Sequence, residues 1–395
     1  MAASTHGAGP SAVGYQHQTW WALVELLRAG PERPDAAITL ELHDDVAWEE
    51  NGSPTELLQV KHHQRAQRSL TDSSVDVWRT LRVWMDEANP GDPDGPKLVL
   101  VTTQTAGVGS AMEALRPRGR NASAALTALE NIASTSRSQE TDSSRKQFLA
   151  LSSSERRTFV SRIVVLDGSP SIDDASESVR IPLHWTLPMG HEDLFLSLVW
   201  RWWDQQALAM LQGRLARVDV SAAQQAIAEI RDRFTMDNLP TLVELVGLNV
   251  GDIERDHASH AFVHQMRWVD YPPKNLQKAM IDYYRAYTQT ARWLDEDLIG
   301  VADLTRFELE LIDEWERQFE WMLDELDPDA DEAAKKKAGK LLLRELLDRT
   351  GITIRARYQD PFFARGQRHM LADRGKVGWH PDFQVRLEQL LQVSA

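Results

Sequence analysis

The order of periodic segments along the chain predicts an α/β domain followed by a mainly α-helical part. Two observations support this prediction. Between residues 13 and 167, helical and strand-like patterns alternate in the order α-β-β-α-β, then helical material, then β. Beyond residue 190, by contrast, the apolar side chains recur at helical spacing almost throughout. The first part is therefore expected to form a mixed sheet flanked by helices.

The expected elements of the first part are bounded by turn and stop signals. The first helix ends before Gly30 and two prolines, and Asn51-Gly52 is the dipeptide typical of a two-residue hairpin turn. In chain order the expected elements are a helix over 13–29, a strand over 38–48, a strand over 56–61, a helix over 71–88, and strands over 97–103 and 161–167.

The second part is predicted to be a separate helical domain. Residues 251–262 are polar and form the expected boundary, and Pro272-Pro273 opens a long helix that runs through Trp293. A second helix covers 303–326, and an amphipathic helix ends the chain. The predicted domains are residues 1–240 and 255–395.

Composition limits the classes of function. The chain has 395 residues, no cysteine, and a formal net charge of −15. Without cysteine, thiolate zinc sites and cysteine nucleophiles are excluded. No apolar run is long enough for a membrane span, and Met1–Gly9 is no signal peptide, so we expect a cytoplasmic protein. The acidic charge argues against non-specific coating of nucleic acid, and it suggests that activity depends on assembly with partners or on homo-oligomerisation.

One hairpin carries residues suited to metal-assisted phosphodiester hydrolysis. Asp45 precedes the Asn51-Gly52 turn, and Gln59 and Lys61 lie on one face of the following strand. The Asp45 carboxylate, the Gln59 amide oxygen and the Val60 backbone carbonyl are the oxygen ligands that Mg²⁺ or Mn²⁺ prefers. Lys61 would orient a water, deprotonate it, or stabilise the charge on phosphate. The spacing alone favours a polar strand pair without chemistry over a nuclease site.

Other residues are candidates for contacts with nucleic acid. Residues 116–162 hold nine basic and four acidic side chains, which is typical either of a phosphate-contact surface or of solvated helix faces. Arg116, Arg118 and Arg120 form the expected contact loop, because Pro and Gly between them favour an exposed segment. His62 either contacts phosphate or is a polar residue at a strand end.

The N-terminal motifs resemble the double-stranded-DNA endonuclease domain of anti-phage effectors. The motifs are Gly14-Tyr15-Gln16-His17-Gln18, Leu40-Glu41-Leu42-His43-Asp44-Asp45-Val46, Glu56-Leu57-Leu58-Gln59-Val60-Lys61-His62-His63, Ser69-Leu70-Thr71-Asp72 and Leu100-Val101-Thr102-Thr103. The resemblance covers roughly residues 12–105. It implies a restriction-endonuclease-like PD-(D/E)xK fold and a Mg²⁺-dependent DNA endonuclease. It also implies that Asp45, Gln59 and Lys61 are catalytic and that Gln18 is the supporting polar residue.

The C-terminal motifs resemble the shared C-terminal domain of effectors in ABC-ATPase three-component systems. They are Phe262-Val263-His264-Gln265-Met266, Asp282-Tyr283-Tyr284-Arg285, Thr290-Ala291-Arg292-Trp293, Asp313-Glu314-Trp315-Glu316, His369-Met370-Leu371-Ala372-Asp373 and Val377-Gly378-Trp379-His380-Pro381-Asp382. The resemblance implies docking to an ABC-type ATPase and a small middle component. The chain itself has no Walker motif, so the ATPase would be another chain.

Three hypotheses follow from these observations. The first is a metal-dependent DNA endonuclease of an anti-phage defence system, docked through its C-terminal domain. The second is a non-enzymatic DNA-binding or adaptor subunit of the ATPase complex, and the third is a nuclease that acts on RNA. A 2-His-1-carboxylate metal set of His369, His380 and Asp382 is an alternative to hydrogen-bonded polar residues within the docking domain.

Overall fold

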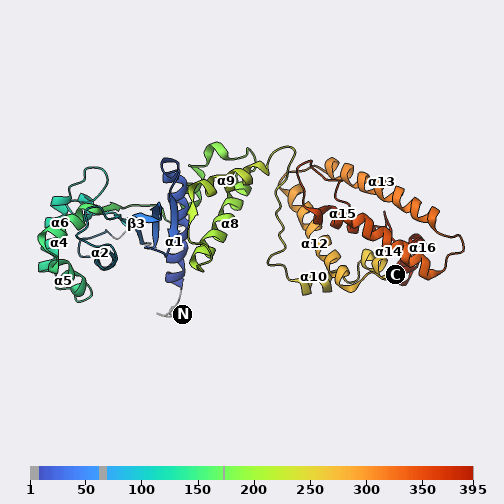
Figure 1. Cartoon of the computed structure of the whole chain (residues 1–395), viewed down its shortest axis with the longest axis horizontal. Coiled ribbons are helices and arrows are strands. Elements are labelled where there is room, and N and C mark those ends of the chain that lie inside the picture. The colour runs from blue at the N-terminus through green and yellow to red at the C-terminus, as the bar shows by residue number, and fades with distance from the viewer. Residues whose placement is uncertain (1–8, 62–68, 172–173, 395) are drawn as a thin grey trace. The chain divides into compact units, whose positions relative to one another are not determined.

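A computed structural model describes residues 9–61, 69–171 and 174–394 of the protein. The chain forms two compact units, Met1–Arg231 and Asp232–Ala395 (Figure 1). Residues 251–262, predicted to be a boundary, hold α10 (Val250–His257) and the start of α11 (Ala261–Trp268) instead. A polar segment can still be helical when its first turn is capped. Here the Asn249 side chain caps α10 by accepting a hydrogen bond from the Asp252 amide.

The first unit is built on a six-stranded mixed sheet in the order β5-β4-β3-β2-β1-β6. Its strands are β1 (Ala37–Leu40), β2 (Val46–Glu50), β3 (Ser53–Lys61), β4 (Lys97–Thr102), β5 (Ile163–Leu166) and β6 (Val218–Asp219). Strands β3, β4 and β5 are parallel, whereas β1 pairs antiparallel with β2 and β6, and β2 pairs antiparallel with β3. Its α-helices are α1 (Gly9–Ala29), α2 (Val75–Glu87), α3 (Ala111–Ala114), α4 (Ala122–Thr135), α5 (Asp142–Ala150), α6 (Ser153–Arg162), α7 (Ala175–Arg180), α8 (Glu192–Leu211) and α9 (Val220–Asp232).

The predicted strand over 38–48 is in fact two antiparallel strands, β1 and β2, joined by the turn 41–45. Glu41 reverses the chain with a left-handed φ of 54°, which non-glycine residues seldom adopt. The predicted hairpin at Asn51-Gly52 is confirmed, since both residues have positive φ and join β2 to β3. The unpredicted turn places Asp45 directly before β2.

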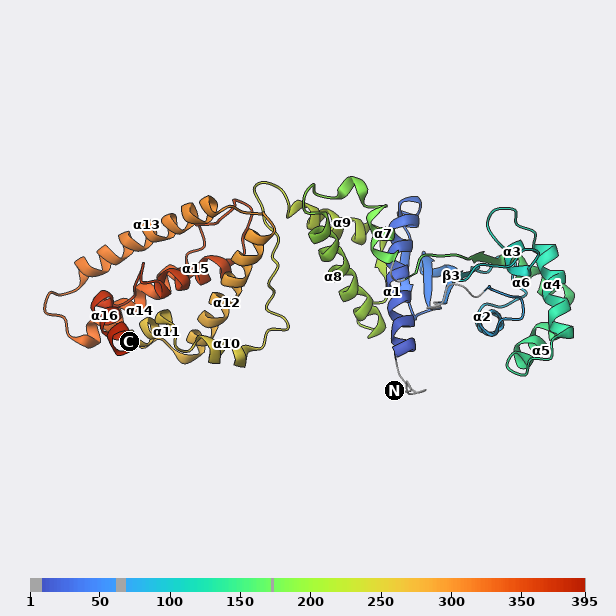
Figure 2. The same cartoon turned by 180° about the vertical axis from the view of Figure 1, so that it is seen from behind.

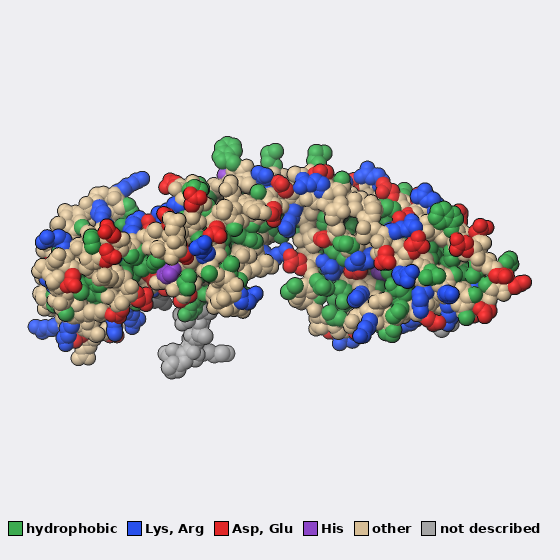
Figure 3. Space-filling view, viewed as in Figure 1, with side chains coloured by type: hydrophobic (Ala, Val, Ile, Leu, Met, Phe, Trp, Pro, Cys, Tyr) green, Lys and Arg blue, Asp and Glu red, His purple; other side chains and the backbone are tan. Residues whose placement is uncertain are grey.

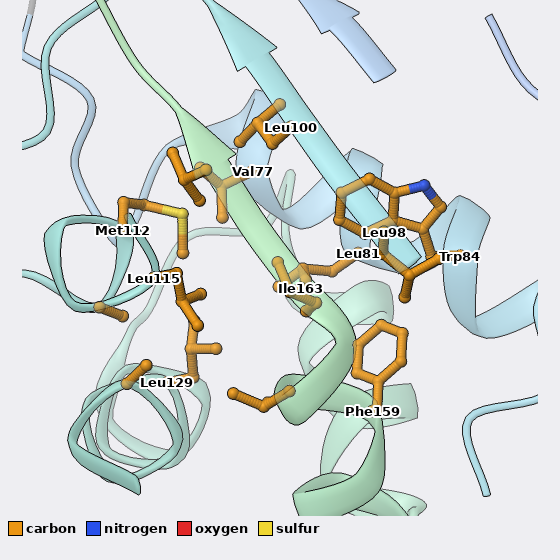
Figure 4. Close-up of a cluster of buried hydrophobic side chains, with 14 of the residues drawn as sticks. Val77, Leu81, Trp84, Leu98, Leu100, Met112, Leu115, Leu129, Phe159 and Ile163 are labelled. Atoms are coloured by element: carbon orange, nitrogen blue, oxygen red, sulfur yellow. The ribbon is translucent and has the colours of Figure 1, made fainter. Parts of the chain in front are cut away.

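Helices cover both faces of the sheet. Helix α1 contacts β1 and β3, and α8 packs against α1 and β1 (Figures 1 and 2). A large hydrophobic cluster lies on the other face, where Trp84 of α2 packs near Leu98 of β4, and Ile163 of β5 lies among side chains of α3, α4 and α6 (Figure 4). Burying aromatic and aliphatic side chains on both sheet faces supplies the main stabilisation of this unit.

The second unit consists of packed helices. Besides α10 and α11 it contains α12 (Pro273–Asp295), α13 (Val301–Glu325), α14 (Glu332–Asp348), α15 (Pro361–Asp373) and α16 (Phe383–Ser394). Helix α12 packs along α15, and Gly366 permits the close approach, because a Cβ at that position would overlap a backbone carbonyl oxygen of α12. A mixed sheet flanked by helices, followed by a helical unit, confirms the predicted fold class. None of the described helices is long and apolar enough to cross a membrane.

Candidate active site

The turn 41–45 is held in place by the first helix. Gln18 of α1 is buried, and its amide nitrogen donates one hydrogen bond to the backbone carbonyl of Asp45, at 2.8 Å, and another to Oε1 of Glu41, at 2.7 Å. The Glu41 amide in turn donates to the Asp45 carbonyl, at 3.3 Å. Gln18 was predicted as a supporting polar residue, and it lies where it can fix both ends of this turn.

Asp45 and Lys61 meet at one end of the sheet, where β2 begins and β3 ends. We call this end the sheet edge. One carboxylate oxygen of Asp45, Oδ2, accepts hydrogen bonds from the Val60 amide at 2.9 Å and from Lys61 Nζ at 3.3 Å. The side chains of Asp45 and Lys61 are 20% and 28% exposed. No described residue donates to the other oxygen, Oδ1. Asp45 is therefore anchored through one oxygen, and the second has no donor among the described residues.

Gln59 is also buried, but it contacts Asp44 rather than Asp45. Its amide nitrogen donates to Oδ1 of Asp44, which also accepts from the Asp45 amide at 2.8 Å. The second oxygen of Asp44 accepts from Nε1 of Trp84, at 2.9 Å. Burial raises the pKa of Asp44 to about 6, against the lowering effect of the hydrogen bonds from Gln59 and Trp84.

The donor atoms at this edge fit a hard divalent cation. Asp45 offers the carboxylate oxygen Oδ1 and Gln59 an amide oxygen, neither of which has a donor among the described residues, and Val60 of β3 adds a backbone carbonyl. Mg²⁺ and Mn²⁺ prefer such oxygen ligands. The three predicted side chains Asp45, Gln59 and Lys61 thus lie at one end of β3. Asp45 contacts Lys61, whereas Gln59 contacts Asp44.

Asp44, Glu41 and Trp84 were not predicted as site residues. Asp44 was visible in the sequence as the neighbour of Asp45, but adjacency does not show which of two carboxylates turns inward. Glu41 stood in a segment that was interpreted as a strand. Trp84 comes from α2, and its approach to Asp44 depends on tertiary packing. His62, a predicted contact with nucleic acid, lies outside the described residues.

The predicted arginine loop serves mainly to hold the structure. Arg116 donates to Asp167 through Nε and Nη2, at 2.8 and 2.5 Å, and Arg120 donates to the backbone carbonyls of Ile163 and Ser161. Arg118 is exposed and has no polar partner among the described residues. It lines a surface groove together with Arg28.

Three further arginines of the basic segment follow the same pattern, whereas Arg137, Lys146 and Arg157 are exposed. Arg145 is buried and donates to three carbonyls at the end of α4, and Arg162 is buried and donates to two carbonyls after α2. Arg156 pairs with Glu130. On the face drawn in Figure 3, Lys and Arg side chains are interspersed with acidic ones over both units. The charge excess in the sequence therefore overstates the basic surface that is free to contact phosphate.

The three residues of the alternative metal set in the second unit do not come together. His380 lies near Glu332 and Asp382, with side-chain atoms 3.6 and 3.9 Å apart, but His369 is not part of this group. The imidazole Nδ1 of His380 accepts a hydrogen bond from the Asp382 amide, so Nε2 carries the proton in the neutral ring and has no lone pair for a metal. Arg386 and Lys335 already neutralise the two carboxylates.

Two family models match the chain. Residues 8–79 match the Cap4 dsDNA endonuclease domain, and residues 262–387 match C-terminal domain 7 of the ABC-three component (ABC-3C) systems. No curated protein and no solved structure matches the chain at a significant level. The first match contains the turn 41–45 and all of β3, and the second runs from α11 into α16. Both resemblances that the sequence motifs indicated are thereby confirmed: the first part of the chain matches the Cap4 endonuclease domain, and the second matches an ABC-3C C-terminal domain.

Proposed function

We propose that the protein is a metal-dependent DNA endonuclease of an anti-phage ABC three-component system, acting on double-stranded DNA in the cytoplasm. The observation that carries the proposal is the pairing of Asp45 and Lys61 at the end of β3, within the segment that matches the Cap4 endonuclease domain. Metal-assisted hydrolysis of a phosphodiester uses a cation beside a positively charged side chain, and the oxygen atoms of Asp45 and Gln59 near Lys61 support such an arrangement.

Each residue of the candidate site has a distinct task. Asp45 Oδ1, the Gln59 amide oxygen and the Val60 carbonyl would hold Mg²⁺ or Mn²⁺. When bound, such an ion lowers the pKa of a coordinated water and stabilises the charge that develops on phosphate. The Lys61 ammonium offers N–H donors to the attacking water or to a phosphate oxygen. Gln18 keeps Asp45 in place through its backbone carbonyl.

The second unit supports docking. Its match to C-terminal domain 7 of ABC-3C systems leads us to propose that it binds an ABC-type ATPase and a small middle component. With a net charge of −15, the chain alone should bind DNA weakly, so the proposal includes assembly with these partners or with further copies of the chain. Arg118 and His62 are the proposed contacts with phosphate, and Arg116 and Arg120 support the loop that carries Arg118.

Plasmid cleavage by purified full-length protein tests the proposal. Wild type, Lys61→Ala and Lys97→Ala are compared with Mg²⁺, with Mn²⁺ and with EDTA, alone and with the ATPase and middle component added. Lys97 is a matched control, because it lies at the opposite end of β4 and pairs with Glu56 on β3. We expect metal-dependent cutting that Lys61→Ala reduces by about 100-fold or more and that Lys97→Ala leaves intact.

Three other outcomes would change the assignment. Cutting by Lys61→Ala at the wild-type rate would refute the proposed site. Salt-sensitive DNA binding without cutting, even in the presence of the ATPase and the middle component, would instead favour an adaptor subunit. Cleavage of an RNA duplex in preference to the plasmid would move the substrate class from DNA to RNA.

A further inference from the structure

Asp44 is a buried carboxylate that is surrounded by hydrogen-bond donors. Its side chain is 8% exposed and receives the Asp45 amide, the Trp84 indole N–H and the Gln59 amide nitrogen. No described cationic side chain pairs with it. Three neutral donors thus converge on this one carboxylate.

The Asp45 amide and the Trp84 indole show which end of the Gln59 amide faces Asp44. A backbone amide and an indole Nε1 can only donate, so both oxygens of Asp44 must act as acceptors toward Asp45 and Trp84. The Gln59 amide has a donating and an accepting end, and the two ends are geometrically interchangeable. Because the oxygen that faces Gln59 is already an acceptor, Gln59 must turn its nitrogen toward Asp44.

The oxygen of the Gln59 amide therefore points away from Asp44. No described residue donates to this oxygen. An amide that was free to rotate would present nitrogen as readily as oxygen, and an NH₂ group cannot ligate a cation. A ligand in a fixed orientation binds more tightly, which is why residues that orient metal ligands typically contribute about 10–100-fold to metal affinity.

We propose that Asp44 is a positioning residue, which holds the Gln59 side chain with its nitrogen inward so that its carbonyl oxygen is available to a divalent cation. This proposal rests on the proposed function, since it takes Gln59 as a ligand. It gives a physical reason why a neutral glutamine can replace a carboxylate here: a glutamate has two equivalent oxygens and needs no orientation, whereas a glutamine needs a partner such as Asp44.

A competing explanation is that Asp44 only ties α2 to the turn through Trp84. The two explanations differ in how the effect of an Asp44 substitution depends on residue 59. A purely structural role costs Mn²⁺ affinity in both backgrounds, and the cost in the Gln59→Glu background is reduced only by the lost repulsion between carboxylates at positions 44 and 59. A positioning role disappears in the Gln59→Glu background, because that side chain presents an oxygen in either rotamer.

The experiment is a double-mutant cycle read out by calorimetric titration of the full-length protein with Mn²⁺, so it needs no turnover. We expect Asp44→Ala to weaken Mn²⁺ binding by about 10–100-fold. The same substitution made on Gln59→Glu should cause no loss. Trp84→Phe is the matched control, since it removes one donor to Asp44 and leaves the contact with Gln59; it should bind Mn²⁺ like wild type.

Folding is checked by circular dichroism and thermal melting. Should Asp44→Ala not fold, Asp44→Asn keeps the volume and one acceptor oxygen, and any loss of Mn²⁺ affinity that it causes must vanish in the Gln59→Glu background. An equal loss in both backgrounds, or no loss with Gln59 present, overturns the proposal. If wild type does not bind Mn²⁺, or if its Mn²⁺ binding does not depend on Asp45, the proposed function itself is overturned.

Discussion

The buried imidazole of His369 predicts that the second unit loses stability in mild acid. His369 lies in α15, is 1% exposed, and its Nδ1 has no hydrogen-bond partner in the described part of the chain. Burial, together with the nearby charges of Arg365 and Arg368, lowers its pKa from 6.5 to about 3. The folded unit therefore keeps this ring neutral at pH values where the unfolded chain protonates it.

The sign and magnitude follow from linkage. Between pH 6.5 and pH 3 the unfolded state binds a proton at His369 and the folded state does not, so the free energy of unfolding falls as the pH falls. A full unit of pH within this window costs about 1.4 kcal/mol. Because the window opens only near pH 6.5, lowering the pH from 7 to 5 should cost about 2 kcal/mol at this residue.

The assay is urea unfolding of the full chain at pH 7 and pH 5. Pulsed hydrogen exchange of α15 peptides reports the second unit separately from the first. In wild type the free energy of unfolding should fall by about 2 kcal/mol more than in His369→Gln, since other titrating groups contribute equally to both. His184→Gln, an exposed histidine of the first unit, is the control and should behave as wild type. Equal pH dependence in wild type and His369→Gln would refute the reasoning.

Three further predictions concern packing, hydrogen bonding and charge. Gly366→Ala should destabilise the second unit by about 1–3 kcal/mol, because its Cβ would overlap α12, whereas Gly351→Ala meets no atom within 4 Å and should be neutral in a thermal melt. Arg145→Ala should lower the free energy of unfolding of the first unit by about 2 kcal/mol or more, because it leaves buried carbonyls unpaired. In the same urea-unfolding assay, the control Arg137→Ala, at an exposed residue, should change this free energy by less than about 0.5 kcal/mol. Arg118→Ala should reduce the salt dependence of DNA binding by about one phosphate contact without lowering the melting temperature; an unchanged salt slope in a fluorescence-anisotropy titration would exclude the contact.

The elements of the first unit were predictable where a local signal marked them. The Asn51-Gly52 hairpin and the buried strand β4 follow from turn chemistry and apolar runs. The reversal between β1 and β2 was not predictable in the same way. The alternation of apolar and polar residues continues through Leu42, which proves to be 54% exposed, and Glu41 adopts its left-handed conformation without glycine. A period of two shows that a segment is extended but does not show where it folds back.

The roles of the charged residues were the least predictable feature. A sequence shows the number of arginines but not their acceptors, and most acceptors of Arg120, Arg145 and Arg162 are backbone carbonyls. Such partners exist only after the helices have packed. The same holds for Asp44, whose partner Trp84 lies 40 positions away along the chain. Local pattern therefore identifies the residue types of a site, and tertiary packing decides which of them face the solvent.

The pair Asp44 and Asp45 shows how one dipeptide can serve both needs of such a site. Asp45 extends to the sheet edge, where Lys61 and the Val60 amide hold one oxygen and leave the other free. Asp44 turns inward, where an aromatic donor from α2 holds it against Gln59. The candidate ligands all lie within residues 8–79, which match the Cap4 endonuclease domain, but Trp84 lies beyond that match. The chemistry of the site is thus contained in the matched segment, whereas part of its positioning depends on how the rest of the unit packs around it. For this reason, substitutions of Asp44 should affect cation binding only through Gln59, the neighbour that shares its other oxygen.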